Sequence, residues 1–151
     1  MDERHGLGTA LVAAQFTLLG LLAAMALPRI LDAQASPGAW ALAAAAALLG
    51  AWALSCNRPG NFNVRPEPRA GGRLVQSGPY RWIRHPMYTS VMLGGAACAW
   101  AAASAWSGLA LALLVATLVI KATLEERWML LEHPGYASYR AGTWRFVPFV
   151  H

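Results

Sequence analysis

Charged side chains are scarce in this sequence. Asp, Glu, Lys and Arg make up 13% of its 151 residues and hydrophobic residues make up 57%, whereas charged residues are about a quarter of a typical soluble domain. This composition excludes a disordered chain, a collagen-like repeat and an ordinary soluble domain. Because much of the chain lies in four apolar runs, we expect an all-α, polytopic integral membrane protein in contact with the lipid bilayer, with a single domain over residues 1–151.

Cysteine is also scarce, with two residues in the chain. Cys56 lies at the end of one apolar run, and Cys98 lies about 15 Å along the helix expected for the next run. A disulfide needs Cα atoms within about 7 Å of each other, so we expect both thiols to be free. The sequence has no C-x-x-C redox motif and no zinc-ligand spacing, so it predicts no metal site.

Acidic residues are outnumbered by basic ones, seven against twelve, which gives a net charge of +5. Half of the basic residues lie in one segment between two apolar runs, opposed by Glu67: Arg58, Arg65, Arg69, Arg73, Arg81 and Arg84. An arginine excess of this kind is typical of a cytoplasmic loop. The clustering therefore favours membrane topogenesis over nucleic-acid binding.

Four apolar runs have the length of membrane-spanning helices, namely residues 7–27, 38–55, 88–105 and 106–124. The first stops at Pro28 and follows a leader that lacks the positive region of a signal peptide, so we expect a membrane anchor. Four spans place both termini, the loop 56–87 and the tail 125–151 on one side, which the arginine excess makes cytoplasmic, as in a bacterial-type inner membrane. Lys121 is expected to snorkel to the interface.

Small residues predict close packing between these helices. The second run contains five consecutive alanines at residues 43–47, and the third contains Gly94 and Gly95. Surfaces of small residues let membrane helices approach closely. The third and fourth runs follow each other almost directly, which predicts a tight antiparallel hairpin.

The tail is too polar to form another span. Residues 125–131 are expected to extend the fourth helix outward, and Pro134 and Gly135 to end it. Residues 136–141 are then expected to form a short helix.

The densest group of polar and aromatic residues lies directly before the third run, at residues 78–88. Its Gly-Pro pair predicts a turn, and the proline after His85 disfavours helical geometry at that histidine while suiting the first position of a helix. The His85 imidazole, Arg84 and free backbone N–H groups can then meet an anionic group such as a carboxylate. The alternative is an interface segment in which Arg81 and Arg84 bind lipid phosphates.

A second group, Glu125-Glu126-Arg127, lies at the inner end of the fourth run. Adjacent side chains point about 100° apart on a helix, so one carboxylate can face a bound cation while the other faces water or an arginine. The alternative is a solvated helix end with an ordinary pair between Lys121 and Glu125.

A third group is formed by the aromatic and basic residues of the tail: Tyr136, Tyr139, Arg140, Trp144 and Arg145. Aromatic rings attract a methylated cation, and arginine can hold a carboxylate at two points. The alternative is an amphipathic helix on the membrane surface.

Together these segments resemble a known family. They are L-V-Q-S-G-P-Y-R-W-I-R-H-P-M-Y at residues 74–88, the Glu125-Glu126-Arg127 run, and Y-A-S-Y-R with W-R-F-V-P within residues 136–148. They are similar to the isoprenylcysteine carboxyl methyltransferase family, which is related to membrane phospholipid methyltransferases. The string G-P-Y-x-x-x-R-H-P-x-Y is the specific part of the resemblance.

The resemblance implies an S-adenosylmethionine-dependent membrane methyltransferase, with a pocket at the cytoplasmic ends of the last two spans and the tail folded beneath them. The cofactor carries a sulfonium and an ammonium, which suit carboxylates and aromatic rings, and a carboxylate, which suits arginine and a helix mouth. The residues implied on the cofactor side are Tyr80, Arg84, His85, Pro86, Tyr88, Glu125 and Glu126.

Under this hypothesis Arg84 orients the reactants, Glu125 counters the positive charge of the cofactor, and His85 belongs to the catalytic group. The methyl acceptor is a carboxylate, thiol or amine of a lipophilic or small molecule. An amine or thiol must first lose a proton, to His85, Glu125 or Tyr88.

Three tail residues are expected to contact the acceptor: Tyr139, Arg140 and Arg145. The hypothesis as a whole requires Glu125 and His85 to lie close together. Two alternatives stay open. A membrane sterol-type reductase would bind the phosphates of NADPH with its arginines, and a noncatalytic four-helix protein would bind anionic lipid through its basic loop.

Overall fold

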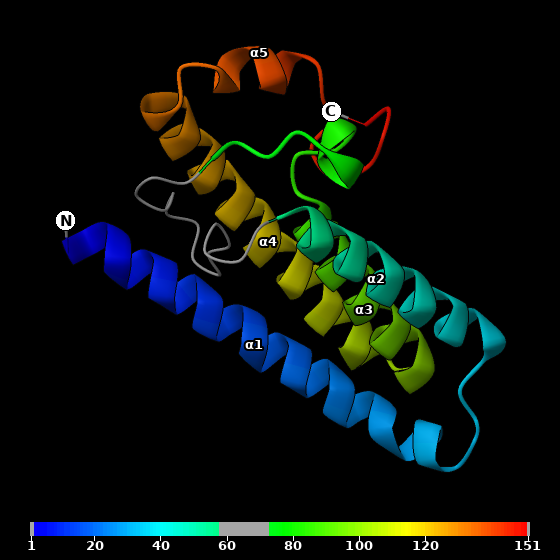
Figure 1. Cartoon of the computed structure of the whole chain (residues 1–151). Helices are drawn as coiled ribbons and strands as arrows, with labels where there is room; N and C mark the ends of the chain where they lie inside the picture. Colours follow the sequence, from blue (N-terminus) through cyan, green and yellow to red (C-terminus); the bar gives the residue numbers. More distant parts are fainter. Residues whose placement is uncertain (1, 58–72, 151) are drawn as a thin grey trace.

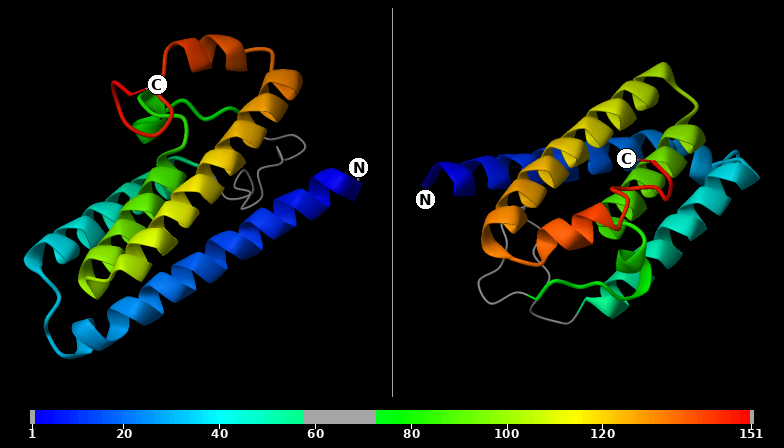
Figure 2. Two further views of the ribbon diagram at one scale, coloured as in Figure 1. Left: turned by 180° about the vertical axis from the view of Figure 1, so that it is seen from behind. Right: turned by 90° about the horizontal axis from the view of Figure 1, so that it is seen from above.

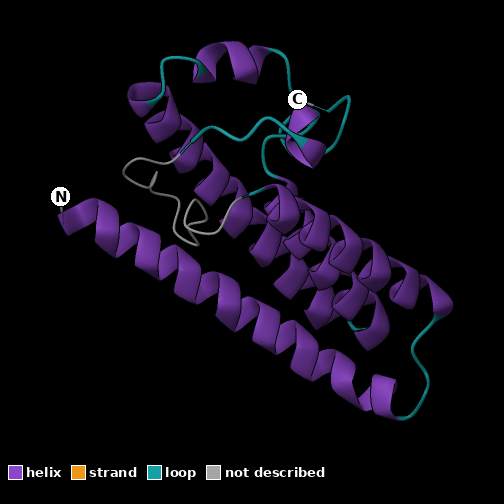
Figure 3. Ribbon diagram, in the orientation of Figure 1, coloured by secondary structure: helices purple, strands orange, loops and turns teal. Residues whose placement is uncertain are grey.

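The computed structural model describes residues 2–57 and 73–150. Its elements are α1 (Asp2–Leu31), α2 (Pro37–Cys56), the short 3-10 helix η1 (Gly78–Arg81), α3 (Pro86–Ala102), α4 (Ala105–Glu132) and α5 (Tyr136–Ala141). Helices and loops make up the whole described part (Figure 3), so the all-α prediction is confirmed. Both cysteines are free thiols, as expected. Part of the predicted basic loop lies outside the described residues, namely Arg58, Arg65, Glu67 and Arg69.

Three helices are long and apolar enough to cross a membrane: His5–Leu31, Pro37–Cys56 and Ala105–Glu132. They support the prediction of an integral membrane protein. The third predicted span corresponds to α3, which has 17 residues, or about 25 Å of helix. The count of four spans and the cytoplasmic orientation stay predictions.

Helix α3 is the centre of the bundle, because it packs against α1, α2 and α4 (Figure 1). A Cβ atom added at Gly50 of α2 would lie 2.7 Å from Oγ of Ser90, and one added at Gly95 would lie 2.7 Å from Cδ2 of Leu114 in α4. Oγ of Ser90 donates a hydrogen bond of 2.8 Å to the carbonyl of Ala46. These contacts confirm the close packing predicted from glycine and alanine.

One span differs from its predicted bounds, and one local prediction is wrong. The first span is longer than its apolar run, because α1 passes Pro28 and continues to Leu31. Proline removes the donor to the carbonyl four residues before it, but its own carbonyl still accepts from the N–H of Asp32 at 3.0 Å. Lys121 does not snorkel: it is 0% exposed, because Oε1 of Gln15 in α1 accepts a hydrogen bond from its ammonium at 2.5 Å within the bundle.

The hairpin and the tail follow the sequence prediction. Helices α3 and α4 are joined by Ala103, in left-handed geometry with φ of 48°, and Ser104, whose Oγ accepts from the N–H of Trp106 at 3.3 Å. Helix α4 extends past the apolar run to Glu132. Helix α5 then lies across the end of the bundle where α4 finishes, next to η1 and the C-terminal segment (Figures 1 and 2).

Candidate active site

The segment before α3 is shaped by glycine and proline. Gly78 has φ of +59°, and a Cβ at this position would collide with the sulfur of Cys56, so glycine is required at the start of η1. His85 is non-helical, with φ of −124° and ψ of 58°, and Pro86 occupies the first turn of α3. The predicted turn and the predicted place of His85 at a helix mouth are confirmed.

The C-terminal segment pairs with this same loop. The N–H of Arg84 donates to the carbonyl of Trp144 at 2.8 Å, and the N–H of His85 donates to the carbonyl of Arg145 at 3.1 Å. An isolated bridge links Ile83 with Trp144. Backbone pairing thus brings the aromatic and basic tail to the mouth of α3.

Glu126 of α4 is the buried anion that holds these segments together. Its side chain is 6% exposed. Oε1 accepts from Nε of Arg84 at 2.9 Å and lies 3.1 Å from Nε2 of His85 and 3.5 Å from Nε of Arg145. Oε2 lies 3.5 Å from Nε of Arg140 in α5. One carboxylate therefore ties α4 to the loop before α3, to α5 and to the C-terminal segment.

The guanidinium of Arg84 is hydrogen-bonded to other groups of the protein. Its side chain is 7% exposed, and besides Glu126 its Nη1 donates to the carbonyl oxygens of Arg140, at 3.1 Å, and of Thr143. The guanidinium therefore fastens the tail over the end of the bundle.

Glu125, one residue earlier, has different surroundings. Its side chain is 33% exposed, and Oε2 accepts a hydrogen bond of 2.9 Å from the hydroxyl of Tyr88. Nδ1 of His85 lies 3.7 Å from the same oxygen, and the His85 and Tyr88 rings stack with centroids 5.3 Å apart. Glu125 and His85 thus lie close together, as the sequence hypothesis requires.

Three tyrosines outside the spans enclose the same end of the bundle. Burial, with Glu125 as the next cause, raises the pKa of Tyr80 to about 12. Burial also raises the pKa of Tyr136 and of Tyr139 well above the usual range, and the Tyr139 hydroxyl donates to the carbonyl of Tyr80 at 2.7 Å. At neutral pH these phenols are hydrogen-bond donors and not bases.

Arg145 carries a donor that the protein does not use. Its Nη2 donates to Oγ1 of Thr123 at 2.6 Å, whereas its Nε is buried and makes no hydrogen bond, although Glu126 lies within ion-pair distance. Arg140 is more open, with half of its side chain exposed. The basic residues predicted for the acceptor therefore lie at the rim of the Glu126 cluster.

Several residues of this region were not predicted from the sequence. Thr123 and Thr143 support the arginines, Phe146 packs beside the His85 ring at 5.7 Å, and Gln15 reaches the site end from α1 through Lys121. The sequence did contain a signal for two of the residues: Gln15 and Lys121 are isolated polar residues within apolar runs. Such residues in membrane helices are often functional.

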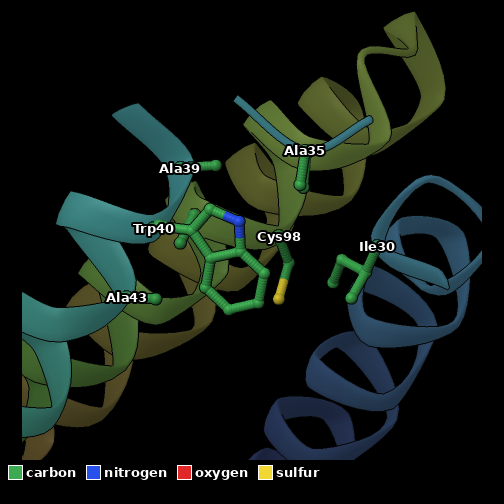
Figure 4. Close-up of a pocket in the computed structure, with 8 residues that line it drawn as sticks. Ile30, Ala35, Ala39, Trp40, Ala43 and Cys98 are labelled. Carbon is green, nitrogen blue, oxygen red and sulfur yellow. The ribbon is translucent and has the colours of Figure 1, made fainter. Parts of the chain in front are cut away.

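A separate apolar pocket lies at the opposite end of the bundle, between α1, α2 and α3 (Figure 4). Its volume is about 60 Å³, well below the roughly 300 Å³ at which small-molecule pockets begin. Trp40, Cys98 and alanines line it, so it offers no chemistry to match the Glu125 region.

Two carboxylates, an imidazole and arginines are thus gathered at one end of the helix bundle. The family model described as phospholipid methyltransferase matches residues 39–135, from the start of α2 to just beyond α4. The chain belongs to this family, which lies in the group of isoprenylcysteine carboxyl methyltransferase-like membrane methyltransferases. The resemblance read from residues 74–148 is confirmed at that level.

One curated relative is 37% identical over 62 residues, the uncharacterized protein YpbQ of Bacillus subtilis (strain 168). The alignment covers 38% of this chain and 36% of that protein, so the chain spans about a third of the length of the relative. No solved structure matches the chain.

Proposed function

We propose that this chain is an S-adenosylmethionine-dependent methyltransferase of the membrane, which methylates a carboxylate, thiol or amine of a lipophilic or small acceptor. The observation that carries the proposal is the position and exposure of the Glu125 carboxylate. In a family of membrane methyltransferases, it is a partly exposed carboxylate that lies against His85 and Tyr88 where α4 emerges from the bundle.

The residues present suit this cofactor at both of its charged ends. Glu125 keeps a third of its side chain exposed and offers an anion to a sulfonium or ammonium. The buried Nε of Arg145, a residue otherwise assigned to the acceptor, lacks a hydrogen bond and offers a donor to a carboxylate of the cofactor or of the acceptor. When bound, S-adenosylmethionine supplies an electrophilic methyl group.

The remaining cofactor-side residues enclose and order this region. The proposal places Tyr80, Arg84, His85, Pro86, Tyr88, Glu125 and Glu126 on the cofactor side. Within this set Glu125 binds the cation, whereas Arg84 and Glu126 are already engaged with each other at 2.9 Å. Their geometry favours positioning of the tail over direct contact with the reactants.

His85 is the best-placed residue to move a proton. Glu126 engages Nε2 at 3.1 Å, which leaves Nδ1 as the ring nitrogen that faces Glu125 at 3.7 Å. A thiol or amine acceptor gives up its proton to this pair, because Nδ1 of a neutral imidazole accepts when Nε2 donates. A carboxylate acceptor needs no base.

The acceptor side is assigned to Tyr139, Arg140 and Arg145. Arg140 is half exposed at the rim and Arg145 is partly exposed, so both can meet a polar head group. We infer that a lipophilic acceptor enters from the bilayer while the water-soluble cofactor arrives from the cytoplasm.

The alternatives fit the structure less well. A nicotinamide reductase is disfavoured because the chain matches the phospholipid methyltransferase model over residues 39–135. A noncatalytic lipid-binding protein has no need of a desolvated cluster around one carboxylate, whose burial is costly.

The test is methyl transfer from methyl-labelled S-adenosylmethionine into a membrane extract, with label followed into lipid, small thiol and peptide fractions. Wild-type protein should label one fraction. Glu125→Gln should abolish labelling, while the same substitution at the exposed Glu132 should leave it intact. Absence of label in every fraction, or equal labelling by both variants, would contradict the proposal.

A further inference from the structure

Lys121 is a buried cation that the proposed mechanism does not use. It is 0% exposed, and Gln15, which accepts from its ammonium at 2.5 Å, is 6% exposed. The pair joins α4 to α1. Gln15 lies outside the segment matched by the family model, which begins at residue 39.

The pair is connected to Glu125 through one aromatic ring. Nζ of Lys121 lies 5.2 Å from the centroid of the Tyr88 ring, within the range in which a cation is attracted to an aromatic face. The hydroxyl of that same ring donates to Oε2 of Glu125 at 2.9 Å. One aromatic ring therefore separates the ammonium of Lys121 from the carboxylate of Glu125.

Sequence spacing gives Lys121 a second possible partner. Residues four apart on a helix are neighbours, so Lys121 and Glu125 share one face of α4 and form a natural ion pair. Gln15 supplies an acceptor that directs the ammonium toward α1. This leaves the exposed part of Glu125 to a ligand.

We propose that Gln15 is a positioning residue for cofactor binding: it holds the ammonium of Lys121 beneath Tyr88, so that the lysine does not form a direct ion pair with Glu125. This inference rests on the proposed function, in which Glu125 receives a cation of S-adenosylmethionine. It makes α1 part of the binding machinery.

The test is equilibrium binding of S-adenosylmethionine to purified variants in detergent. Gln15→Leu should weaken binding by about tenfold, the size expected when a charged hydrogen bond is redirected, and should raise KM more than it lowers kcat. Gln15→Asn, a milder change, should weaken binding less. Gln15→Glu should retain it, because a carboxylate still accepts from the ammonium.

The decisive variant is the double substitution Gln15→Leu with Lys121→Met, which removes the competing cation and should restore most of the lost affinity. Gln34→Leu is the matched control, since Gln34 is an exposed glutamine after α1. Wild-type affinity in Gln15→Leu, or a double variant as weak as the single one, overturns the inference while leaving the proposed function standing. If wild-type protein binds no adenosyl ligand, both fall.

Discussion

Glu125 and Glu126 are adjacent in the sequence, yet their carboxylates have opposite surroundings. The Glu126 side chain is 6% exposed and meets Arg84 at 2.9 Å, whereas the Glu125 side chain is 33% exposed and meets the Tyr88 hydroxyl at 2.9 Å. His85 lies between them, with one ring nitrogen toward each. The two glutamates therefore have different roles in this account: Glu126 holds the C-terminal tail in place, and Glu125 is available to bind a cationic group of the cofactor.

Loss of the Glu126 charge should destabilise the protein. In Glu126→Gln the buried groups of Arg84 and His85 lose their anion, and breaking a buried pair typically costs about 3 kcal/mol or more. Thermal unfolding in detergent should show a clearly lower Tm than in wild type. Glu132→Gln, which changes an exposed glutamate of the same helix, should leave Tm unchanged; an equal Tm for Glu126→Gln would refute the role assigned to this residue.

The phenols of Tyr80, Tyr136 and Tyr139 should ionise at a higher pH than free tyrosine does. Burial raises the pKa of Tyr80 to about 12 and raises those of Tyr136 and Tyr139, against about 10 for a free phenol. Because the folded state favours the neutral phenol, its stabilisation is fully present below about pH 10 and is lost as the pH rises through about 12 at Tyr80.

The measurement is phenolate absorbance during an alkaline titration of the folded protein, compared with the protein unfolded in denaturant. The chain has four tyrosines, so the signal is readily assigned. The folded protein should show little phenolate at a pH where the unfolded chain is half ionised. Coincident titration curves would show that the tyrosines are not buried as described.

Cysteine labelling tests the predicted topology. In a background with Cys56→Ala and Cys98→Ala, Ser77→Cys lies before α3 and Ala105→Cys lies after it, and both native residues are exposed. An impermeant maleimide should label position 105 in intact cells and position 77 only after permeabilisation. Labelling of both positions from the same side would show that α3 does not cross the membrane.

Much of the fold was predictable because hydrophobic runs and helix breakers act locally. Pro134 and Gly135 end α4, and α5 occupies residues 136–141 as predicted. The apolar run 7–27 underestimates the length of α1, which continues past Pro28 to Leu31, because hydrophobicity marks the part of a helix that suits lipid and not the end of its hydrogen bonding. The prediction that Lys121 snorkels was wrong because the position of its ammonium depends on an acceptor, Gln15, which lies in another helix and 106 residues away in the sequence.

The sequence predicted which residues form the candidate site better than it predicted what each of them does there. The motif brings Arg84, His85 and Tyr88 together with the two glutamates. Sequence alone does not tell which glutamate is buried. Neighbouring helix positions point roughly 100° apart, so the packing of the tail decides which of the two carboxylates it covers. The backbone pairing of residues 83–85 with 144–145 supplies that information.

The most direct measurement of the central claim is thermal protection of the purified protein by S-adenosylhomocysteine. A ligand that binds the folded state raises Tm as its concentration exceeds Kd. The account predicts a higher Tm for wild type and for Glu132→Gln, little change for Glu125→Gln, and none with NADPH. Protection by NADPH instead, or equal protection of wild type and Glu125→Gln, would contradict it.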